Sequence, residues 1–183
     1  MVDNPSLTVE VKKHTDLDEA YECIKSSILG EAVLSSPLKE IYRWEHSISR
    51  SQIFSVQLYN VFSFVSVHLV RHVTLQPYVT SRREDRGGTG EEGRYTLINH
   101  RILCNAEALL DMARRRLCYK SSQETRQTML SIKEAIRQVD PDLSYWMVPN
   151  CVYRGGICPE PRSCGNYRVR KSKGEEDELV MRV

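Results

Sequence analysis

Residues 66–86 concentrate side chains that could bind an anion or assist catalysis: two histidines, four arginines and several hydroxyl groups. His68, Arg71 and His72 are spaced i, i+3 and i+4, which places them on one face of a helix. A proline soon after His72 prevents that helix from continuing. The extended or looped segment that follows would then hold Ser81 and Arg83 beside the same cavity. Fixed cations next to a helix end are typical of a site for an anionic ligand.

The bulk composition limits the classes of protein to consider. The chain has 183 residues, of which 40% are hydrophobic, enough for one domain with a substantial core. Its net charge is only +2, so any anion site must be local, and general binding to nucleic acid or to membranes is not expected. There is no long apolar run and no signal-peptide pattern at the start, so we expect a cytoplasmic protein whose six cysteines are reduced.

The spacing of apolar residues, and the residues that end helices and strands, predict the elements that position these side chains. Residues 7–13 and 52–59 alternate between apolar and polar and predict strands, with a few extra residues bulging near 49–51. Residues 86–95 are rich in Gly, Glu and Arg and predict a loop, either a solvated connector or a lid. Helical periodicity and capping residues predict helices over 17–27, 37–46, 61–72, 96–118 and 123–139.

The predicted helix over residues 96–118 combines an apolar face with polar insertions. Asn99, Arg101 and Asn105 are the polar positions, and such residues on a helix face solvent more often than a ligand. The apolar face of this helix would be formed by Leu103, Ala106, Leu110 and Ala113.

Three cysteines near the C-terminus lie among glycines and prolines, at Cys151, Cys158 and Cys164. They are the weak candidates for a zinc site. Structural zinc usually takes four ligands and a Cys-x-x-Cys pair, and neither is evident here, so no metal is expected. We treat residues 151–170 as a separate Cys/Gly/Pro-rich segment, and 171–183 as a charged, disordered tail.

The central segment resembles the signature of the flavin-dependent thymidylate synthase family. That signature is Arg-His-Arg, seven residues, then Ser, and here Arg71-His72 is followed by Thr80-Ser81 and then Arg83. Val73 stands where the family has the second arginine.

Further motifs resemble the same family in the same order. The run from Trp44 to His46 is similar to an aromatic-Glu-His element, and the spacing of Asn99, Arg101 and Asn105 is similar to an Asn-x-Arg-x-x-x-Asn helix that contacts the flavin. The run that begins Arg116-Leu117-Cys118 resembles an Arg-Leu-Cys element. The Cys-Pro-Glu at position 158 resembles the ending of a shorter, phage-type branch.

The resemblance implies an α+β fold, with an antiparallel sheet packed by long helices in a catalytic domain over residues 1–150. It also implies a homotetramer whose active sites lie between subunits, located in the cytoplasm, of the host if phage-encoded. The implied reaction is reductive methylation of dUMP to dTMP, with methylenetetrahydrofolate giving the carbon and FAD, reduced by NADPH, giving the hydride. Such a site needs fixed positive donors, because charge develops on the ring carbonyl.

The same resemblance also implies catalytic, substrate-binding and FAD-binding roles for individual residues. Arg83 and Arg116 would be the catalytic cations. Substrate contacts would come from Ser81, Arg82, Arg83, Arg86, Arg116 and His68. FAD contacts would come from Arg71, His72, Val73, Asn99, Arg101, Asn105, Glu45 and His46.

Two alternatives remain. One is an enzyme that methylates or hydroxymethylates carbon 5 of another pyrimidine nucleotide, dCMP included. The other is a non-catalytic binding module with a zinc-stapled C-terminus.

Overall fold

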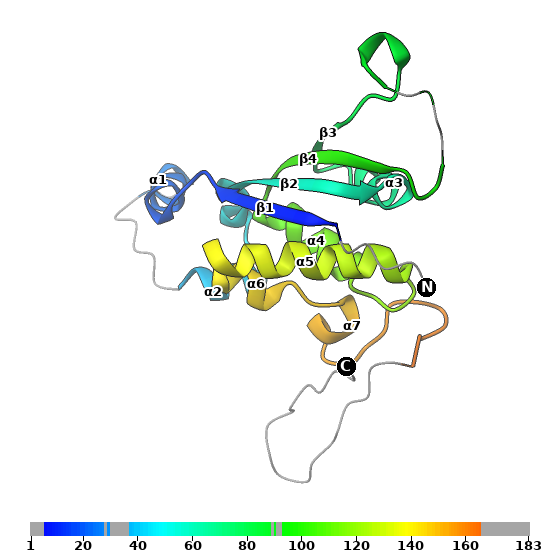
Figure 1. The fold of residues 1–183 in the computed structure, drawn as a ribbon. Coiled ribbons are helices and arrows are strands. Elements are labelled where there is room, and N and C mark those ends of the chain that lie inside the picture. The colour runs from blue at the N-terminus through cyan, green and yellow to red at the C-terminus, as the bar shows by residue number, and fades with distance from the viewer. Residues whose placement is uncertain (1–5, 28, 30–36, 89, 91–92, 166–183) are drawn as a thin grey trace.

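A four-stranded antiparallel sheet lies at the centre of the fold (Figure 1). The computed structural model describes residues 6–27, 29, 37–88, 90 and 93–165. The strand order is β1-β2-β4-β3, and every neighbouring pair is antiparallel. The strands are β1 (Thr8–Lys13), β2 (Ile53–Phe62), β3 (Gln76–Val79) and β4 (Leu97–Asn105).

Helices cover one face of this sheet, with α4, α5 and α6 below it in Figure 1. None of the helices in the described ranges combines the length and the apolar character needed to cross a membrane. The helices are α1 (Leu17–Ser27), α2 (Leu38–Trp44), α3 (Ser63–Val70), α4 (Ala106–Arg116), α5 (Gln123–Val139), α6 (Pro141–Trp146) and α7 (Asn150–Tyr153), with short 3-10 turns η1 (Ser47–Ser51) and η2 (Glu84–Arg86).

The core forms between the covered face of the sheet and these helices. Alternation along β2 points Phe54, Val56 and Leu58 inward, and each is fully buried. Burying an aliphatic or aromatic side chain of this size stabilises the fold by about 1.5–3 kcal/mol. On the other face of the sheet, a row runs across all four strands through Glu10, Gln57, Arg101 and Tyr78.

Side-chain caps determine where the helices under the sheet begin. Asn105 Oδ1 accepts a hydrogen bond from the backbone N–H of Ala108 at 2.9 Å, which starts α4. Ser122 and Asp140 cap α5 and α6 in the same way. Each cap satisfies a backbone donor that the helix leaves unpaired, a contribution of about 1 kcal/mol.

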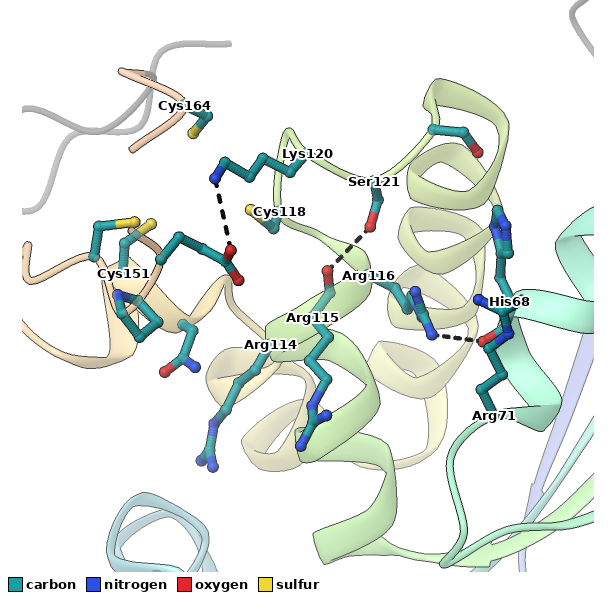
Figure 2. A pocket seen from close by; sticks show the side chains of 15 residues that line it. His68, Arg71, Arg114, Arg115, Arg116, Cys118, Lys120, Ser121, Cys151 and Cys164 are labelled. Carbon is teal, nitrogen blue, oxygen red and sulfur yellow. Dashed lines mark hydrogen bonds and ion pairs between the residues drawn. The ribbon is translucent and has the colours of Figure 1, made fainter. Parts of the chain in front are cut away.

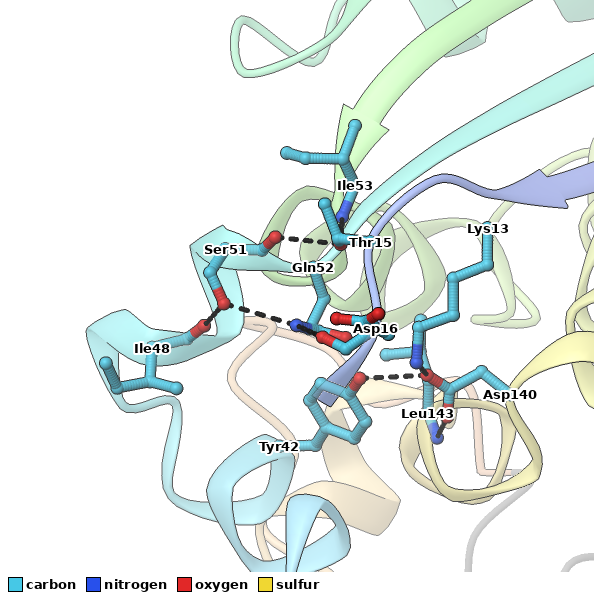
Figure 3. Close-up of polar contacts among 10 residues, drawn as sticks. All are labelled: Lys13, Thr15, Asp16, Tyr42, Ile48, Ser51, Gln52, Ile53, Asp140 and Leu143. Atoms are coloured by element: carbon cyan, nitrogen blue, oxygen red, sulfur yellow. Dashed lines mark hydrogen bonds and ion pairs between the residues drawn. The ribbon is translucent and has the colours of Figure 1, made fainter. Parts of the chain in front are cut away.

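Asp140 also joins three separate parts of the chain (Figure 3). Its Oδ2 accepts from Lys13 Nζ at 2.7 Å and from the Tyr42 hydroxyl at 2.9 Å, while Oδ1 accepts from the backbone N–H of Leu143 at 2.9 Å. The carboxylate is only 4% exposed. Burial and this nearby charge raise the pKa of Tyr42, so the hydroxyl stays protonated as a donor. The cluster ties β1 and α2 to the junction of α5 and α6.

The extra residues expected near 49–51 form the 3-10 turn η1 before β2. The hydroxyl of Thr15 donates to the Ser51 carbonyl at 2.9 Å and accepts from the Ile53 N–H at 2.8 Å (Figure 3). Gln52 Nε2 donates to the Asp16 carbonyl at 2.9 Å. These bonds hold the start of α1 against the start of β2.

The prediction of one helix over residues 96–118 is wrong in its first half. Residues 97–105 form strand β4, and only the second half, from Ala106 to Arg116, is helical. The reason is a period of two: Ile98, His100 and Ile102 are buried, and the residues between them are exposed.

The prediction of a helix over 61–72 needs a smaller correction. Strand β2 continues through Phe62, and α3 ends at Val70, so His72 lies just beyond the helix. The strands at 7–13 and 52–59, the helices at 17–27, 37–46 and 123–139, and the α+β class with an antiparallel sheet are confirmed, within one to three residues at the ends.

Candidate functional site

A cationic cavity of about 380 Å³ opens between the ends of α3 and α4 and the segment around α7 (Figure 2). Such a volume suits one nucleotide-sized ligand. One end of the cavity carries guanidinium groups and the other end carries thiols. Its lining consists of His68, Arg71, Arg114, Arg115, Arg116, Cys118, Lys120, Ser121, Ser122, Asn150, Cys151, Cys158, Pro159, Glu160 and Cys164.

Arg116 is held in place by two hydrogen bonds at the inner end of this cavity. Its Nε donates to His72 Nε2 at 3.0 Å, and one terminal nitrogen donates to the His68 carbonyl at 2.7 Å. Because Nε2 of His72 accepts, its proton must lie on Nδ1, which faces Asp111 Oδ2 at 3.2 Å. The chain Asp111–His72–Arg116 therefore fixes a neutral tautomer and a rigid guanidinium.

Charge is crowded around Arg116. Burial lowers its pKa, and the nearby Arg71 and Arg115 lower it further. Burial likewise lowers the pKa of His72 and of His68, and in both cases the charge of Arg116 adds to the effect. Both histidines are therefore neutral at pH 7, and the excess positive charge at this end favours binding of an anion.

A chain of hydroxyl groups connects His68 to the start of α5. Nδ1 of His68 lies 2.8 Å from the Thr125 hydroxyl, which lies 2.8 Å from the Ser122 hydroxyl. Ser122 lines the cavity and also accepts from the Thr125 N–H as the cap of α5. The histidine ring is thus oriented by groups that belong to the fold.

Arg114 separates this cavity from a second one. Its guanidinium forms an ion pair with Glu45 and stacks 3.8 Å above the ring of Tyr153. The side chain is only 11% exposed, and burial lowers its pKa. The second cavity has a volume of about 480 Å³ and is lined by Glu45, Arg50, Thr74, Asn105, Glu107, Ala108, Leu110, Asp111 and Arg114.

Two residues expected to contact FAD, Glu45 and Asn105, lie at the second cavity. The side-chain oxygen of Asn105 already serves as the cap of α4, which leaves its amide nitrogen for other contacts. His46 follows Glu45 and packs edge-on against Trp44, with ring centroids 5.7 Å apart. Val73, at the position of the family arginine, is 95% exposed.

Asn99 and Arg101 lie on the exposed side of β4 and line neither cavity. The side-chain oxygen of Asn99 accepts from the Asn60 N–H at 3.3 Å. Arg101 is paired in register with Gln57 on β2 and Tyr78 on β3. The alternation of the strand puts the two side chains on the same face, which a helix would not have done.

Ser81, Arg82, Arg83 and Arg86 belong to an arm that follows β3 and projects from the sheet, at the top of Figure 1. None of the four lines either cavity. Arg83 donates to both carboxylate oxygens of Asp85, at 2.8 and 2.7 Å, and both side chains are exposed.

The arm turns tightly just after η2. A Cβ at Gly88 would lie 2.2 Å from the backbone of Arg82, so only glycine fits this turn. Of the loop predicted over residues 86–95, the structure describes residues 86–88, 90 and 93–95.

The fold thus brings His68, Arg71 and Arg116 together, with His72 directly behind them. Most of the other expected residues lie at the second cavity, on the exposed face of β4, or on the arm that follows β3. Sequence reasoning missed Asp111, Lys120 and Cys118. Asp111 precedes Arg115 by four residues on α4, a spacing that the predicted helix over 96–118 already contains.

The three C-terminal cysteines lie at the cavity, with Cys118 on the same wall. All six cysteines of the chain are free. Within the described ranges, no three His, Cys, Asp or Glu side chains are arranged to hold a metal ion as they stand.

Comparison with known proteins gives a fold relationship. No protein-family model matches the chain, and no curated protein matches its sequence. Among solved structures, Thymidylate Synthase X from Helicobacter pylori with FAD and dUMP superposes with a TM-score of 0.58 at 14% identity, over 76% of this chain and 97% of that one. The UMP/dUMP methylase PolB from Streptomyces cacaoi, bound with 5-Br dUMP, superposes with a TM-score of 0.60 at 14% identity, over 77% and 94%. The chain therefore has the fold of these proteins.

Proposed function

We propose that this chain is a flavin-dependent enzyme that methylates carbon 5 of a pyrimidine nucleoside monophosphate, with dUMP as substrate and dTMP as product. The observation that carries the proposal is Arg116, which His72 and the His68 carbonyl fix at the inner end of a cationic cavity. The shared fold supports it, since one superposed structure contains FAD and dUMP and the other contains a dUMP analogue.

The donor set at the cavity fits an anionic nucleotide. Arg71, Arg115 and Lys120 line the cavity and offer charged donors to phosphate oxygens. Arg116 would face the ring carbonyl, which carries negative charge in the enolate form that makes carbon 5 nucleophilic. A rigid guanidinium stabilises that charge without having to reorganise during the reaction.

Covalent attack by a cavity thiol is not required. Burial raises the pKa of Cys118 and of Cys151, so both thiols are protonated at neutral pH and are poor nucleophiles. We propose that Ser81 acts as a hydrogen-bonding group and not as a nucleophile, because its hydroxyl accepts from the backbone N–H of Arg83, which cannot act as a base.

FAD, when bound, supplies the hydride that no side chain can supply, and NADPH and methylenetetrahydrofolate are the proposed co-substrates. A cavity of about 380 Å³ suits one nucleotide and not a nucleotide together with FAD. We therefore assign flavin contacts to Arg71 within this chain and to Asn99 and Arg101 on the open sheet face. The site would be completed by further copies in a homotetramer, which brings the Ser81–Arg83 arm to the cavity of another subunit.

UMP is a second candidate substrate, favoured by the likeness to the UMP/dUMP methylase PolB. The proposed chemistry at carbon 5 is the same for UMP, dUMP and dCMP. Methyl and hydroxymethyl products differ by one oxygen atom and are separated by their mass.

The test starts from purified protein incubated with FAD. We expect flavin absorption bands that persist through desalting and shift when dUMP is added, and a nucleotide product heavier by one methylene group when both co-substrates are present. Protein that is colourless after incubation with FAD and desalting, and that leaves UMP, dUMP and dCMP unchanged, would refute the proposed enzyme function and favour a binding module.

A further inference from the structure

We propose that Cys118, Cys151, Cys158 and Cys164 together bind one zinc ion, which fastens the C-terminal segment onto the ends of α4 and α7. The sequence offers only three cysteines in this segment, one ligand short of a structural zinc site. The fold supplies the fourth, Cys118, which follows α4 and is 33 positions before Cys151 in the sequence.

The four thiols line a single cavity, although they come from three parts of the chain. In Figure 2, Cys118, Cys151 and Cys164 surround the end of the cavity opposite Arg116 and His68. The two other cysteines are elsewhere: Cys104 is buried in the core and Cys23 lies on α1.

Exposure argues against a packing role for the four thiols. Cys164 is exposed, and the other three are partly exposed, whereas Cys104 is only 6% exposed. Burial raises the pKa of Cys118, and the thiols of Cys164 and Cys158 raise it further, consistent with their proximity. Thiols gathered in this way and accessible to solvent are suited to a soft divalent metal.

The surrounding charges fit a four-thiolate site. Zinc bound by four thiolates carries a net charge of −2. Arg114 and Lys120 line the same cavity, together with one carboxylate, Glu160, which pairs with Lys120 at 3.6 Å. Zinc binding displaces the four thiol protons to solvent, so the raised pKa values are overcome by metal coordination.

Binding requires a movement, since no three described ligand side chains have metal-binding geometry as they stand. Residues 154–165 contain no helix or strand, and Gly155, Gly156 and Gly165 adopt positive φ angles there. This irregular segment can close onto Cys118 and Cys151 without disrupting an element. Tetrahedral coordination would bring all four sulfurs to about 2.3 Å from the ion.

The experiment measures metal content in full-length protein kept reduced, stripped with a chelator, reloaded with zinc and desalted. We expect one zinc per chain by elemental analysis, and cobalt substitution should give the absorption of tetrahedral thiolate coordination. Cys118→Ser should weaken zinc binding by more than the roughly 10- to 100-fold typical for loss of an outer contact, while Cys23→Ser, the matched control, should bind as the wild type does.

Several results would overturn the site. These results are wild-type protein that retains no stoichiometric zinc, a cobalt form that lacks thiolate absorption, or Cys118→Ser protein that binds zinc as tightly as the wild type. Disulfides among these cysteines in protein that takes up no zinc would also refute it. The wild-type measurements do not depend on a variant folding, and flavin binding to the same sample reports separately on the proposed enzyme function.

Discussion

Nε of Arg116 donates a hydrogen bond to Nε2 of His72 at 3.0 Å, and this contact determines both the tautomer of the histidine and the direction of the guanidinium. Asp111 holds the opposite ring nitrogen at 3.2 Å. The three side chains come from α4 and from the turn after α3, so the anion site depends on how these two helices pack.

Replacing Arg116 by lysine keeps the charge but removes the paired donors to His72 and His68. Lysine also lacks the paired donors that we propose for the dUMP ring carbonyl, and losing a charged hydrogen bond there costs about 2 kcal/mol, or roughly thirtyfold in Kd for dUMP. Titration calorimetry measures the change. Arg137→Lys is the matched control, because Arg137 is exposed, pairs with Glu134 on α5 and lines neither cavity. Equal effects of the two substitutions would contradict the special role of Arg116.

The pKa of His72 is lowered from its ordinary value of about 6.5. The neutral form of His72, which accepts from Arg116, is therefore fully populated above pH 6.5 and is lost as the pH falls through the lowered pKa. We expect dUMP affinity to drop over that range. His72→Gln keeps an acceptor that does not titrate and should flatten the profile, whereas the titration of the nucleotide phosphate is common to both proteins. Identical profiles would rule out His72 as the titrating group.

His100 provides a second pH-dependent effect, on stability. It is fully buried, its Nδ1 lies 3.1 Å from the Ser66 hydroxyl, and burial lowers its pKa to about 4. The unfolded chain binds a proton near pH 6.5, so the folded state loses stability as the pH falls from 6.5 to 4, by on the order of 3 kcal/mol.

Urea unfolding between pH 7 and pH 4 measures this loss. His100→Leu should be less stable than the wild type at pH 7, because Ser66 loses its partner, but should show a smaller decline on acidification. His46→Gln, at an exposed position, should keep the wild-type slope. A slope unchanged by His100→Leu would show that other groups cause the acid sensitivity.

The separation of Arg83 from Arg116 within one chain predicts complementation between subunits. Arg83→Ala and Arg116→Ala should each be inactive alone. Coexpressed and purified together, they should recover part of the activity, because some shared sites then contain only intact residues. A mixture as inactive as either parent would mean that both residues act in the same chain.

The sequence predicted the helices that cover the sheet better than it predicted strand β4. Residues 123–139 form α5 with the expected ends, because Ser122 and Asp140-Pro141 mark them chemically. Strand β4 was missed because His100, a polar residue type, occupies a buried position in its alternation. The spacing of Leu103, Ala106 and Leu110 predicts one longer helix, and only its second half, from Ala106, is helical.

Only part of the candidate site was predicted, because some of its residues come together only in the folded chain. His68, Arg71 and Arg116 were identified from local spacing and motif, and the fold brings them together. Asp111 and Cys118 reach the site only through the packing of α4 against α3 and α7, which no local pattern encodes. The arm that carries Ser81 lies outside the cavity of its own chain.

The most direct test of the proposed function is the release of tritium from carbon 5 of dUMP into water, with FAD, NADPH and methylenetetrahydrofolate present. Methylation at carbon 5 must displace that hydrogen, so we predict release by the wild type, release by Arg137→Lys and little or none by Arg116→Lys. Flavin-loaded wild-type protein that binds dUMP yet releases no tritium would contradict the proposed function.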